Sequence, residues 1–323
     1  MARSEELSVR AGDVSLAGTL ALPDGPPAAD PAGRYPNALL LPSWLPRDRS
    51  GAWDRIGHPS WYAPNEPAPG LLARLADALA ERGVASLRCD PRGCGGSAGA
   101  WESVQLFTKI DDARDMLAAM RSHGALDLRR TGIVGHGEGA TIALAVAVGD
   151  PAVGALTLIG PAARSFRDVL RRGVAERART GTNRDHAIVA ALDRWSEDII
   201  ERAQRREAAF ELPLPGGEAV RLELAGVEQA IQTPGLALAT MLHRSVTLVH
   251  GADDRWSDPD ESDLLAVALT EGGNRPSRRV VAAAGHELAE ASVAIIGELA
   301  DDLAARLLPR DLPPVLVAIE GMG

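Results

Sequence analysis

Short runs of hydrophobic residues alternate along most of the chain with longer stretches in which hydrophobic residues recur at helical spacing. Most of these runs are continuous, which is typical of strands buried on both faces of a sheet. We expect strands at 7–10, 14–21, 37–41, 84–87, 133–134, 154–159, 246–249 and 279–283. Helices are expected at 71–82, 111–122, 140–148, 258–269 and 286–307. This alternation predicts an α/β fold whose central sheet is mostly parallel and flanked by helices.

The alternation stops between residues 162 and 240. Residues 164–206 have the pattern of two or three charged amphipathic helices, and residues 210–224 that of a hairpin about Gly216 and Gly217. The strand pattern resumes at 246, as it would after a segment inserted into a sheet domain. We therefore predict a core of residues 1–161 and 241–323 with an inserted helical cap of residues 162–240. The last hydrophobic run, 314–319, has no assigned place.

The most informative stretch is Thr131–Ile142, TGIVGHGEGATI. A hydrophobic run leads into Gly135–Gly139, and a helix of small residues follows. A strand, a tight glycine turn and a helix form the context of a nucleophile elbow, where Gly-x-Ser-x-Gly places a serine at the apex of a strained turn. The apex residue here is Gly137. The sequence predicts a serine-hydrolase scaffold with a vacant nucleophile position.

An acid and a histidine follow this turn in the order that a catalytic triad requires. Asp254 lies in a loop after the expected strand 246–249, and His286 follows the strand 279–283 and begins the expected last helix. In the α/β-hydrolase architecture each of these groups follows the carboxyl end of a strand. A carboxylate-oriented imidazole is a competent general base near neutral pH. We predict that Asp254 orients His286 for this role.

From about residue 7 to 307 the chain resembles the bacterial α/β-hydrolases of the dienelactone-hydrolase and esterase kind. The resemblance rests on residues 16–23, on 75–92 with the Asp-x-Arg-Gly-x-Gly-x-Ser motif at 90–97, on the Gly135–Gly139 turn, and on the loops of Asp254 and His286. It implies a hydrolase core with a helical cap, and an acyl-enzyme mechanism in relatives that keep the serine.

The chain departs from the family pattern at two places. Gly137 stands where the family has serine, and Pro42–Pro46 (PSWLP) stands where the family usually has His-Gly-x-Gly-Pro, which supplies an oxyanion-hole N–H. Proline has no N–H, and Trp44 is bulky where a small residue would leave room for a substrate carbonyl. Loss of the nucleophile of a triad costs on the order of 10⁶ in rate. Ordinary ester hydrolysis through a serine ester is therefore not expected.

We expect instead an enzyme that uses His286 and Asp254 without a covalent intermediate, on a small hydrophobic ester, lactone or other carbonyl compound. The pair would activate water directly, or move a proton in an elimination, isomerisation or cyclisation. Two alternatives remain at this point. One is a non-catalytic protein that binds a ligand in the cleft, and the other is an esterase inactivated by a serine-to-glycine substitution at position 137.

Five residues near these positions are candidates for substrate binding: Ser43, Trp44, His136, Glu138 and Trp256. The net charge is −10 and charges of both signs are mixed along the chain, which argues against a nucleic-acid partner. The chain contains no stretch of about 18 or more hydrophobic residues, so no membrane span is predicted. We expect a cytoplasmic protein with a small-molecule substrate and without a cofactor or metal, and a homodimer is left open. The nearly exclusive use of arginine over lysine is typical of high-GC coding, as in actinobacteria. From this apparent source we expect a role in secondary metabolism.

Overall fold

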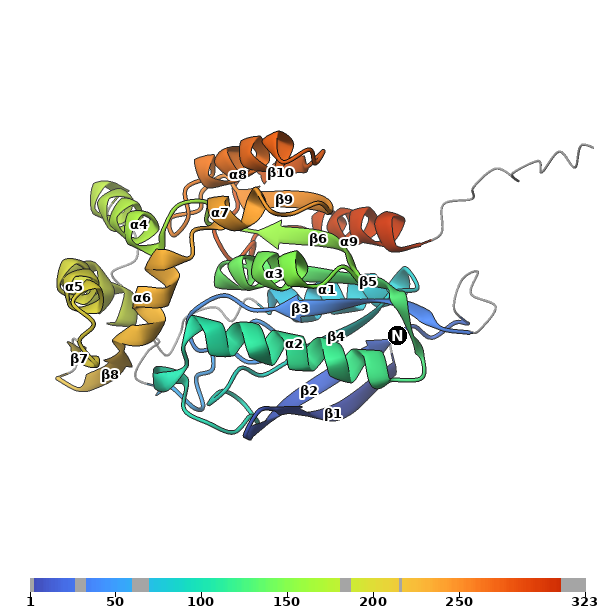
Figure 1. Cartoon of the computed structure of the whole chain (residues 1–323), viewed down its shortest axis with the longest axis horizontal. Helices are drawn as coiled ribbons and strands as arrows, with labels where there is room; N and C mark the ends of the chain where they lie inside the picture. The colour runs from blue at the N-terminus through green and yellow to red at the C-terminus, as the bar shows by residue number, and fades with distance from the viewer. Residues whose placement is uncertain (1–2, 27–32, 60–69, 181–186, 215–216, 309–323) are drawn as a thin grey trace, which may run out of the picture.

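The computed structural model describes residues 3–26, 33–59, 70–180, 187–214 and 217–308 (Figure 1). Among them, eight strands form one sheet in the order β1-β2-β4-β3-β5-β6-β9-β10. The strands are β1 Arg3–Ala11, β2 Val14–Leu22, β3 Tyr35–Leu41, β4 Ala85–Cys89, β5 Leu126–His136, β6 Val153–Ile159, β9 Ser245–Gly251 and β10 Ser277–Val281. β2 is antiparallel to β1 and β4, and the other neighbours are parallel. The predicted mostly parallel sheet is confirmed.

Helices cover both faces of this sheet (Figure 1). On one face α1 (Leu71–Glu81) packs against α9 (Val293–Leu307), and both contribute to one hydrophobic cluster. On the other face α2 (Leu106–Ser122), α3 (Glu138–Gly149), α7 (Gly235–Ala239) and α8 (Asp260–Glu271) share a second cluster. Helical spacing explains which side of α1 packs against the sheet. Its leucines recur at 71, 72, 75 and 79, on one side of the helix, and all are buried.

The last helix begins later than the sequence predicted. α9 starts at Val293, where the Ser292 hydroxyl accepts a hydrogen bond from the Ile295 N–H and caps the helix. Ala283 and Leu288 have positive φ angles of 51° and 46°, which a helix does not admit. His286 therefore lies in a loop between β10 and α9 and not at a helix start, which corrects the expectation.

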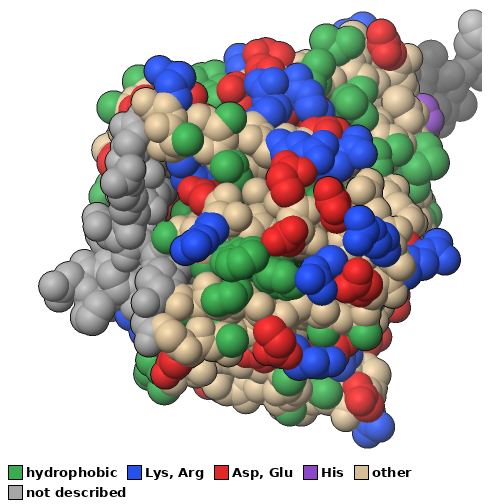
Figure 2. All heavy atoms as spheres, turned by 90° about the vertical axis from the view of Figure 1, so that its left-hand side faces the viewer, with side chains coloured by type: hydrophobic (Ala, Val, Ile, Leu, Met, Phe, Trp, Pro, Cys, Tyr) green, Lys and Arg blue, Asp and Glu red, His purple; other side chains and the backbone are tan. Residues whose placement is uncertain are grey.

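The segment between β6 and β9 lies at the end of the sheet toward which β6 and β9 point (Figure 1). It contains α4 (Phe166–Thr180), α5 (Ala187–Gln204), the antiparallel hairpin of β7 (Ala209–Pro213) and β8 (Ala219–Glu223), and α6 (Leu224–Gln232) before α7. Gly216, assigned to the hairpin turn, lies outside the described residues, as does the run 314–319. Lys and Arg side chains are interspersed with Asp and Glu over this end of the molecule, around a small hydrophobic patch (Figure 2). No helix among the described residues is long and hydrophobic enough to cross a membrane.

The turn between β5 and α3 depends on two glycines that let strand and helix approach closely. A Cβ at Gly135 would lie 2.2 Å from the backbone oxygen of Gly139, and one at Gly139 would lie 2.6 Å from the backbone oxygens of Leu41 and Pro42. Real side chains do not tolerate such distances. Both positions of this turn therefore require glycine.

Gly139→Ala is expected to lower the free energy of unfolding by about 1–3 kcal/mol or more, because its Cβ would displace backbone at the end of β3. Urea unfolding followed by circular dichroism measures the change. Gly149→Ala, at the other end of α3, is the matched control, since its Cβ would lie 3.8 Å from the nearest atom, Nη2 of Arg114. Equal stability of the two variants would contradict the close-packing argument.

Candidate active site

Five residues from separate strand ends meet at the carboxyl edge of the sheet. Ser43 follows β3, Gly137 follows β5, Gly160 follows β6, Asp254 follows β9 and His286 follows β10. Parallel strands end at a common edge, so residues far apart in sequence come together there. Four of them (all but Asp254) line a cleft of about 770 Å³, a volume that includes space open to solvent.

Asp254 and His286 form the predicted hydrogen-bonded pair. His286 Nδ1 lies 2.8 Å from Asp254 Oδ2, and Nε2 is the ring nitrogen on the side of Ser43. The other carboxylate oxygen of Asp254 accepts the backbone N–H groups of Trp256 and Ser257 at 2.8 and 2.9 Å. The buried carboxylate is therefore held from both sides, and it fixes the orientation of the imidazole.

The charges of the pair shift both pKa values. Burial by itself would lower the pKa of His286, but the facing Asp254 carboxylate outweighs it and the pKa is raised above the ordinary value. Burial by itself would raise the pKa of Asp254, and His286 and His250 reverse this, so that its pKa falls well below the usual range. Asp254 is ionised at any pH at which His286 can titrate.

Gly160 and His250 support this pair, and the sequence reasoning missed both. A Cβ at Gly160, whose φ is +55°, would lie 2.9 Å from His286 Cε1 and 3.3 Å from Asp254 Oδ2. The fully buried His250 lies with Nε2 3.3 Å from Asp254 Oδ2. The sequence signal was weak: a Gly-Pro pair at the end of one strand and a histidine at the end of another.

The nucleophile position above Gly137 is not vacant, which corrects the sequence prediction. Gly137 has φ 55° and ψ −117°, a strained turn directly before α3. A Cβ placed on it would lie 2.1 Å from Ser43 Oγ and 2.9 Å from His286 Nε2. The Ser43 hydroxyl thus occupies the space of a side chain at the elbow, 3.3 Å from His286 Nε2.

Of the five candidate binding residues, Ser43, Trp44, Glu138 and Trp256 line the cleft, and their role in binding stays a prediction. His136 does not line it, because its side chain is fully buried beside His286. Its Nε2 donates to the backbone carbonyl of His286 at 3.0 Å. Burial lowers the pKa of His136 to about 3, so the ring stays neutral. The expectation that His136 contacts substrate is wrong, and its role is to support the loop of His286.

Comparison with protein families identifies the scaffold. Residues 69–290 match the model described as serine aminopeptidase, S33, which is more than half of the chain. The chain belongs to the serine aminopeptidase S33 family of α/β-hydrolases. A sequence comparison with curated proteins gave no match.

Solved structures similar to this S33-family chain share its fold at low sequence identity. Est1E from Butyrivibrio proteoclasticus, with ferulic acid bound, matches with a TM-score of 0.62 and 14% identity over 93% of this chain and 99% of its own. The α/β-hydrolase GrgF from Penicillium sp. sh18 matches at 0.60 and 17%, over 94% and 99%. A hypothetical protein from Pseudomonas aeruginosa matches at 0.64 and 14%, over 94% of each chain.

A buried ion pair joins the loop of Ser43 to the loop of His286 in this S33-family chain. Nη1 and Nη2 of Arg47 donate to the two carboxylate oxygens of Glu287 at 2.8 and 2.6 Å. The Arg47 side chain is 2% exposed, and its guanidinium stacks on the Trp53 ring at 3.8 Å. Burial would raise the pKa of Glu287, but the Arg47 charge outweighs it, and the pKa is lowered. An isolated arginine and glutamate in two distant loops gave no sequence signal for this pair.

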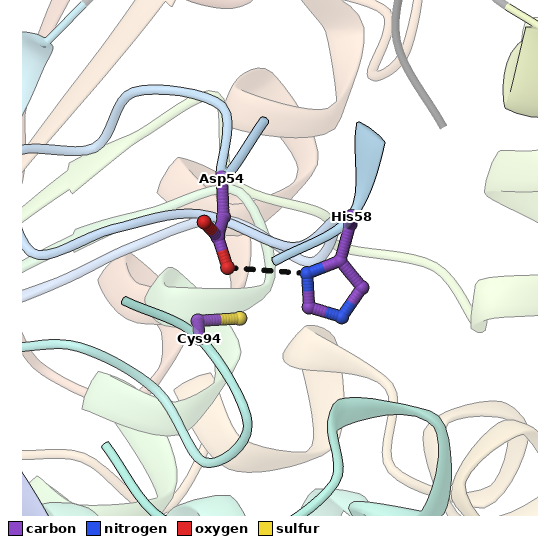
Figure 3. Close-up of side chains that lie close together, drawn as sticks. All are labelled: Asp54, His58 and Cys94. Carbon is purple, nitrogen blue, oxygen red and sulfur yellow. Dashed lines mark hydrogen bonds and ion pairs between the residues drawn. The ribbon is translucent and has the colours of Figure 1, made fainter. Parts of the chain in front are cut away.

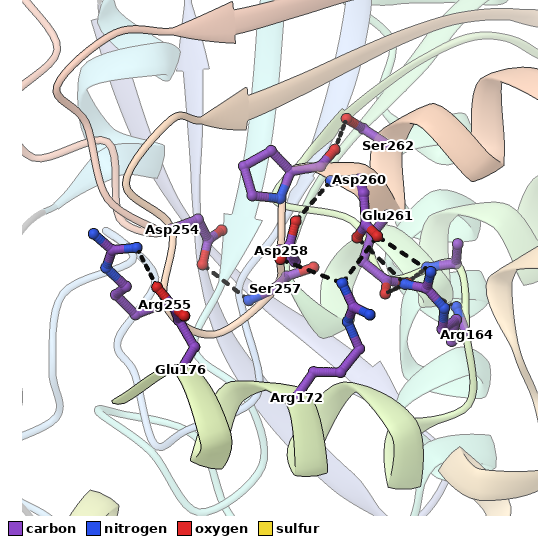
Figure 4. A network of polar contacts seen from close by, with 12 residues as sticks. Arg164, Arg172, Glu176, Asp254, Arg255, Ser257, Asp258, Asp260, Glu261 and Ser262 are labelled. Atoms are coloured by element: carbon purple, nitrogen blue, oxygen red, sulfur yellow. Dashed lines mark hydrogen bonds and ion pairs between the residues drawn. The ribbon is translucent and has the colours of Figure 1, made fainter. Parts of the chain in front are cut away.

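Helix α4, in the segment between β6 and β9, contacts the loop that carries Asp254. Glu176 of α4 pairs with Arg255 at 2.8 Å, as Figure 4 shows. The buried Arg177 donates to the backbone carbonyl of Arg255 at 2.9 Å and lies over the Trp256 ring at 4.6 Å. These contacts hold Trp256 at the wall of the cleft.

A second cluster, formed by Asp54, His58 and Cys94, is better explained as structural (Figure 3). The Asp54 carboxylate lies 3.1 Å from His58 Nδ1 and also accepts the backbone N–H groups of Gly57 and Gly95, each at 3.1 Å. Burial raises the pKa of Cys94 to about 12, so the thiol stays protonated. The cluster joins the loop after β3 to the turn after β4, and we assign it no chemistry.

Arg47→Ala is expected to destabilise the protein by about 3–5 kcal/mol, because it leaves the largely buried Glu287 carboxylate without the charge of its partner. The free energy of unfolding in urea measures this. Arg171→Ala breaks the exposed pair between Arg171 and Glu197 and serves as the control, for which stability close to wild type is expected. A small effect of Arg47→Ala would contradict the role of this pair as the tie between the two loops.

Proposed function

We propose that this S33-family chain hydrolyses carboxylic esters or lactones, with His286 as general base and Asp254 as the group that orients it. The observation that carries the proposal is the 2.8 Å hydrogen bond between Asp254 and His286 Nδ1, which leaves Nε2 toward the cleft. A neutral imidazole held in this way takes a proton from whatever hydroxyl or water attacks the carbonyl carbon. The first turn of α3, directly after Gly137, offers backbone N–H groups to the oxyanion that then develops.

The walls of the cleft favour an uncharged, hydrophobic substrate. Trp44, Leu45, Phe166, Val169 and Trp256 are among the residues that line it. Three charged side chains also line it, and each is paired with an opposite charge. The pairs are Arg47–Glu287, Lys109–Glu138 and Arg164–Asp260. A substrate with its own charge would compete with these pairs, whereas a neutral ester would leave them in place.

The same base would serve an elimination, isomerisation or cyclisation, but the elbow turn with a hydroxyl above it favours acyl chemistry. A non-catalytic binding protein would not require an imidazole hydrogen-bonded to a buried carboxylate and facing the cleft. That arrangement favours an enzyme over the binding alternative. A role in secondary metabolism stays a prediction.

His286→Ala is expected to reduce kcat/KM on p-nitrophenyl esters or lactones with hydrophobic acyl groups on the order of 10⁴–10⁶-fold. The loss follows from removal of the imidazole that faces the cleft and would accept the proton of the attacking oxygen. His243→Ala, which changes an exposed histidine, is the control with unchanged rates. Wild-type rates in His286→Ala would overturn the proposal.

The pH profile of kcat/KM should have one rising limb that belongs to His286. The base is active only when neutral, so activity is lost as the pH falls through its pKa, and Asp254 raises that pKa above the ordinary value for histidine. Asp254→Asn removes the charge that raises the pKa of His286. The rising limb should therefore move to lower pH, and the maximal rate should fall because the imidazole is less well oriented. Rates that do not change between pH 5 and 9 would contradict the assignment of the base.

A further inference from the structure

We infer that Ser43, on the loop after β3, is the nucleophile of this site, and that it replaces the serine missing from the elbow at Gly137. The inference rests on the proposed function, because it names the group that His286 activates. The catalytic hydroxyl would thus come from the loop after β3 instead of the turn after β5, but at nearly the same position in the site.

The position of the Ser43 hydroxyl carries the inference. Its Oγ lies 2.1 Å from the point where an elbow side chain at position 137 would begin, and 3.3 Å from His286 Nε2. Ser43, His286 and Asp254 are therefore connected in the order hydroxyl, imidazole, carboxylate, with a short His–Asp bond. The longer Ser–His distance is typical of a site without substrate.

Gly137 and Ser43 also fit each other sterically. A Cβ at 137 would lie 2.8 Å from Ser43 Cβ as well as 2.1 Å from its Oγ. Glycine at the elbow thus leaves the space that the hydroxyl of Ser43, on the loop after β3, occupies. This makes a simple inactivating serine-to-glycine substitution a poor explanation of the site, because a serine restored at position 137 would crowd Ser43.

The loop of Ser43 is held where the chemistry needs it. Gly139 lets α3 approach the backbone oxygens of Leu41 and Pro42 directly before Ser43. Four residues beyond Ser43, the Arg47–Glu287 pair joins the same loop to the neighbour of His286. A nucleophile on a loop needs this support, since a displacement of about 1 Å can cost on the order of 10² in rate.

The reaction is a two-step acyl transfer. Ser43 Oγ bonds to the carbonyl carbon while His286 Nε2 takes the hydroxyl proton, and the tetrahedral oxyanion collapses with loss of the alcohol, which leaves with that proton. A water molecule then attacks the Ser43 ester and gives its proton to His286. The carboxylic acid is released as Ser43 regains the proton. Ester and water yield acid and alcohol, and no other reactant is needed.

Covalent labelling tests the nucleophile without knowledge of the substrate. The full chain is treated with a small alkyl fluorophosphonate, which phosphonylates activated serines, and the modified residue is located by peptide mass spectrometry. We expect stoichiometric modification of Ser43, and loss of labelling in Ser43→Ala and in His286→Ala. Ser122→Ala, which changes an exposed serine of α2, should label like wild type. Absence of label from Ser43 in wild type would overturn the inference.

Kinetics separate this inference from the proposed function. If both are correct, Ser43→Ala and His286→Ala each lose on the order of 10⁴–10⁶-fold in hydrolysis, and the double variant loses no more than either, because the residues act as a unit. If His286→Ala is inactive while Ser43→Ala keeps most of the wild-type rate, water attacks directly: the inference fails and the function stands. If both variants keep wild-type rates, the proposed function fails as well.

An exchange of the two residues gives a further criterion. Gly137→Ser alone should be impaired, because its side chain would collide with Ser43. In Ser43→Gly/Gly137→Ser the hydroxyl returns to the elbow at nearly the same place, and at least a roughly 10-fold higher kcat/KM than in Ser43→Gly is expected. A double variant no more active than Ser43→Gly would contradict the shared position of the two hydroxyls.

Discussion

The site depends on one buried carboxylate. Asp254 is placed by two backbone N–H groups of its own loop, and from that fixed point it orients His286 and raises its pKa. A buried charge is costly unless it is fully hydrogen-bonded, and here the bonds that satisfy the charge also aim the imidazole. Two neighbouring features serve this arrangement. Gly160 leaves room for the Asp254–His286 pair, and an ion pair from α4 holds the loop of Asp254 in place.

Around this pair the structure uses contacts that bridge distant segments. Arg47 and Glu287 connect the loops of Ser43 and His286, and the buried His136 donates a hydrogen bond to the His286 carbonyl. Because these contacts are largely buried, each contributes more to stability than the many exposed ion pairs on the surface. The positions of the Ser43 hydroxyl and the His286 imidazole are therefore set by contacts that join their loops to each other and to the core.

The relation between Ser43 and Gly137 shows how a hydroxyl from another loop can fill the space of an elbow side chain when the elbow residue is glycine. Catalysis requires a hydroxyl at a point about 3 Å from the base, and it does not require that a given strand supply it. The elbow turn of Gly137 and the N-terminus of α3 persist, and a hydroxyl from β3 occupies the space that glycine leaves. A search for Gly-x-Ser-x-Gly alone would find glycine at the apex and would not detect the Ser43 hydroxyl beside it.

Much of the fold followed from the sequence, because local pattern determines local structure. Hydrophobic runs predicted the buried strands, and the glycines of 135–139 predicted the sharp turn, since only residues without Cβ fit there. The order of Gly137, Asp254 and His286 also anticipated the pair now seen, since strand ends of a parallel sheet share an edge. Contacts between distant loops had no such signal. That Ser43 fills the place above Gly137, that Arg47 meets Glu287, and that His136 faces inward were decided only by the tertiary structure, because each depends on how two loops far apart in the chain are packed against each other.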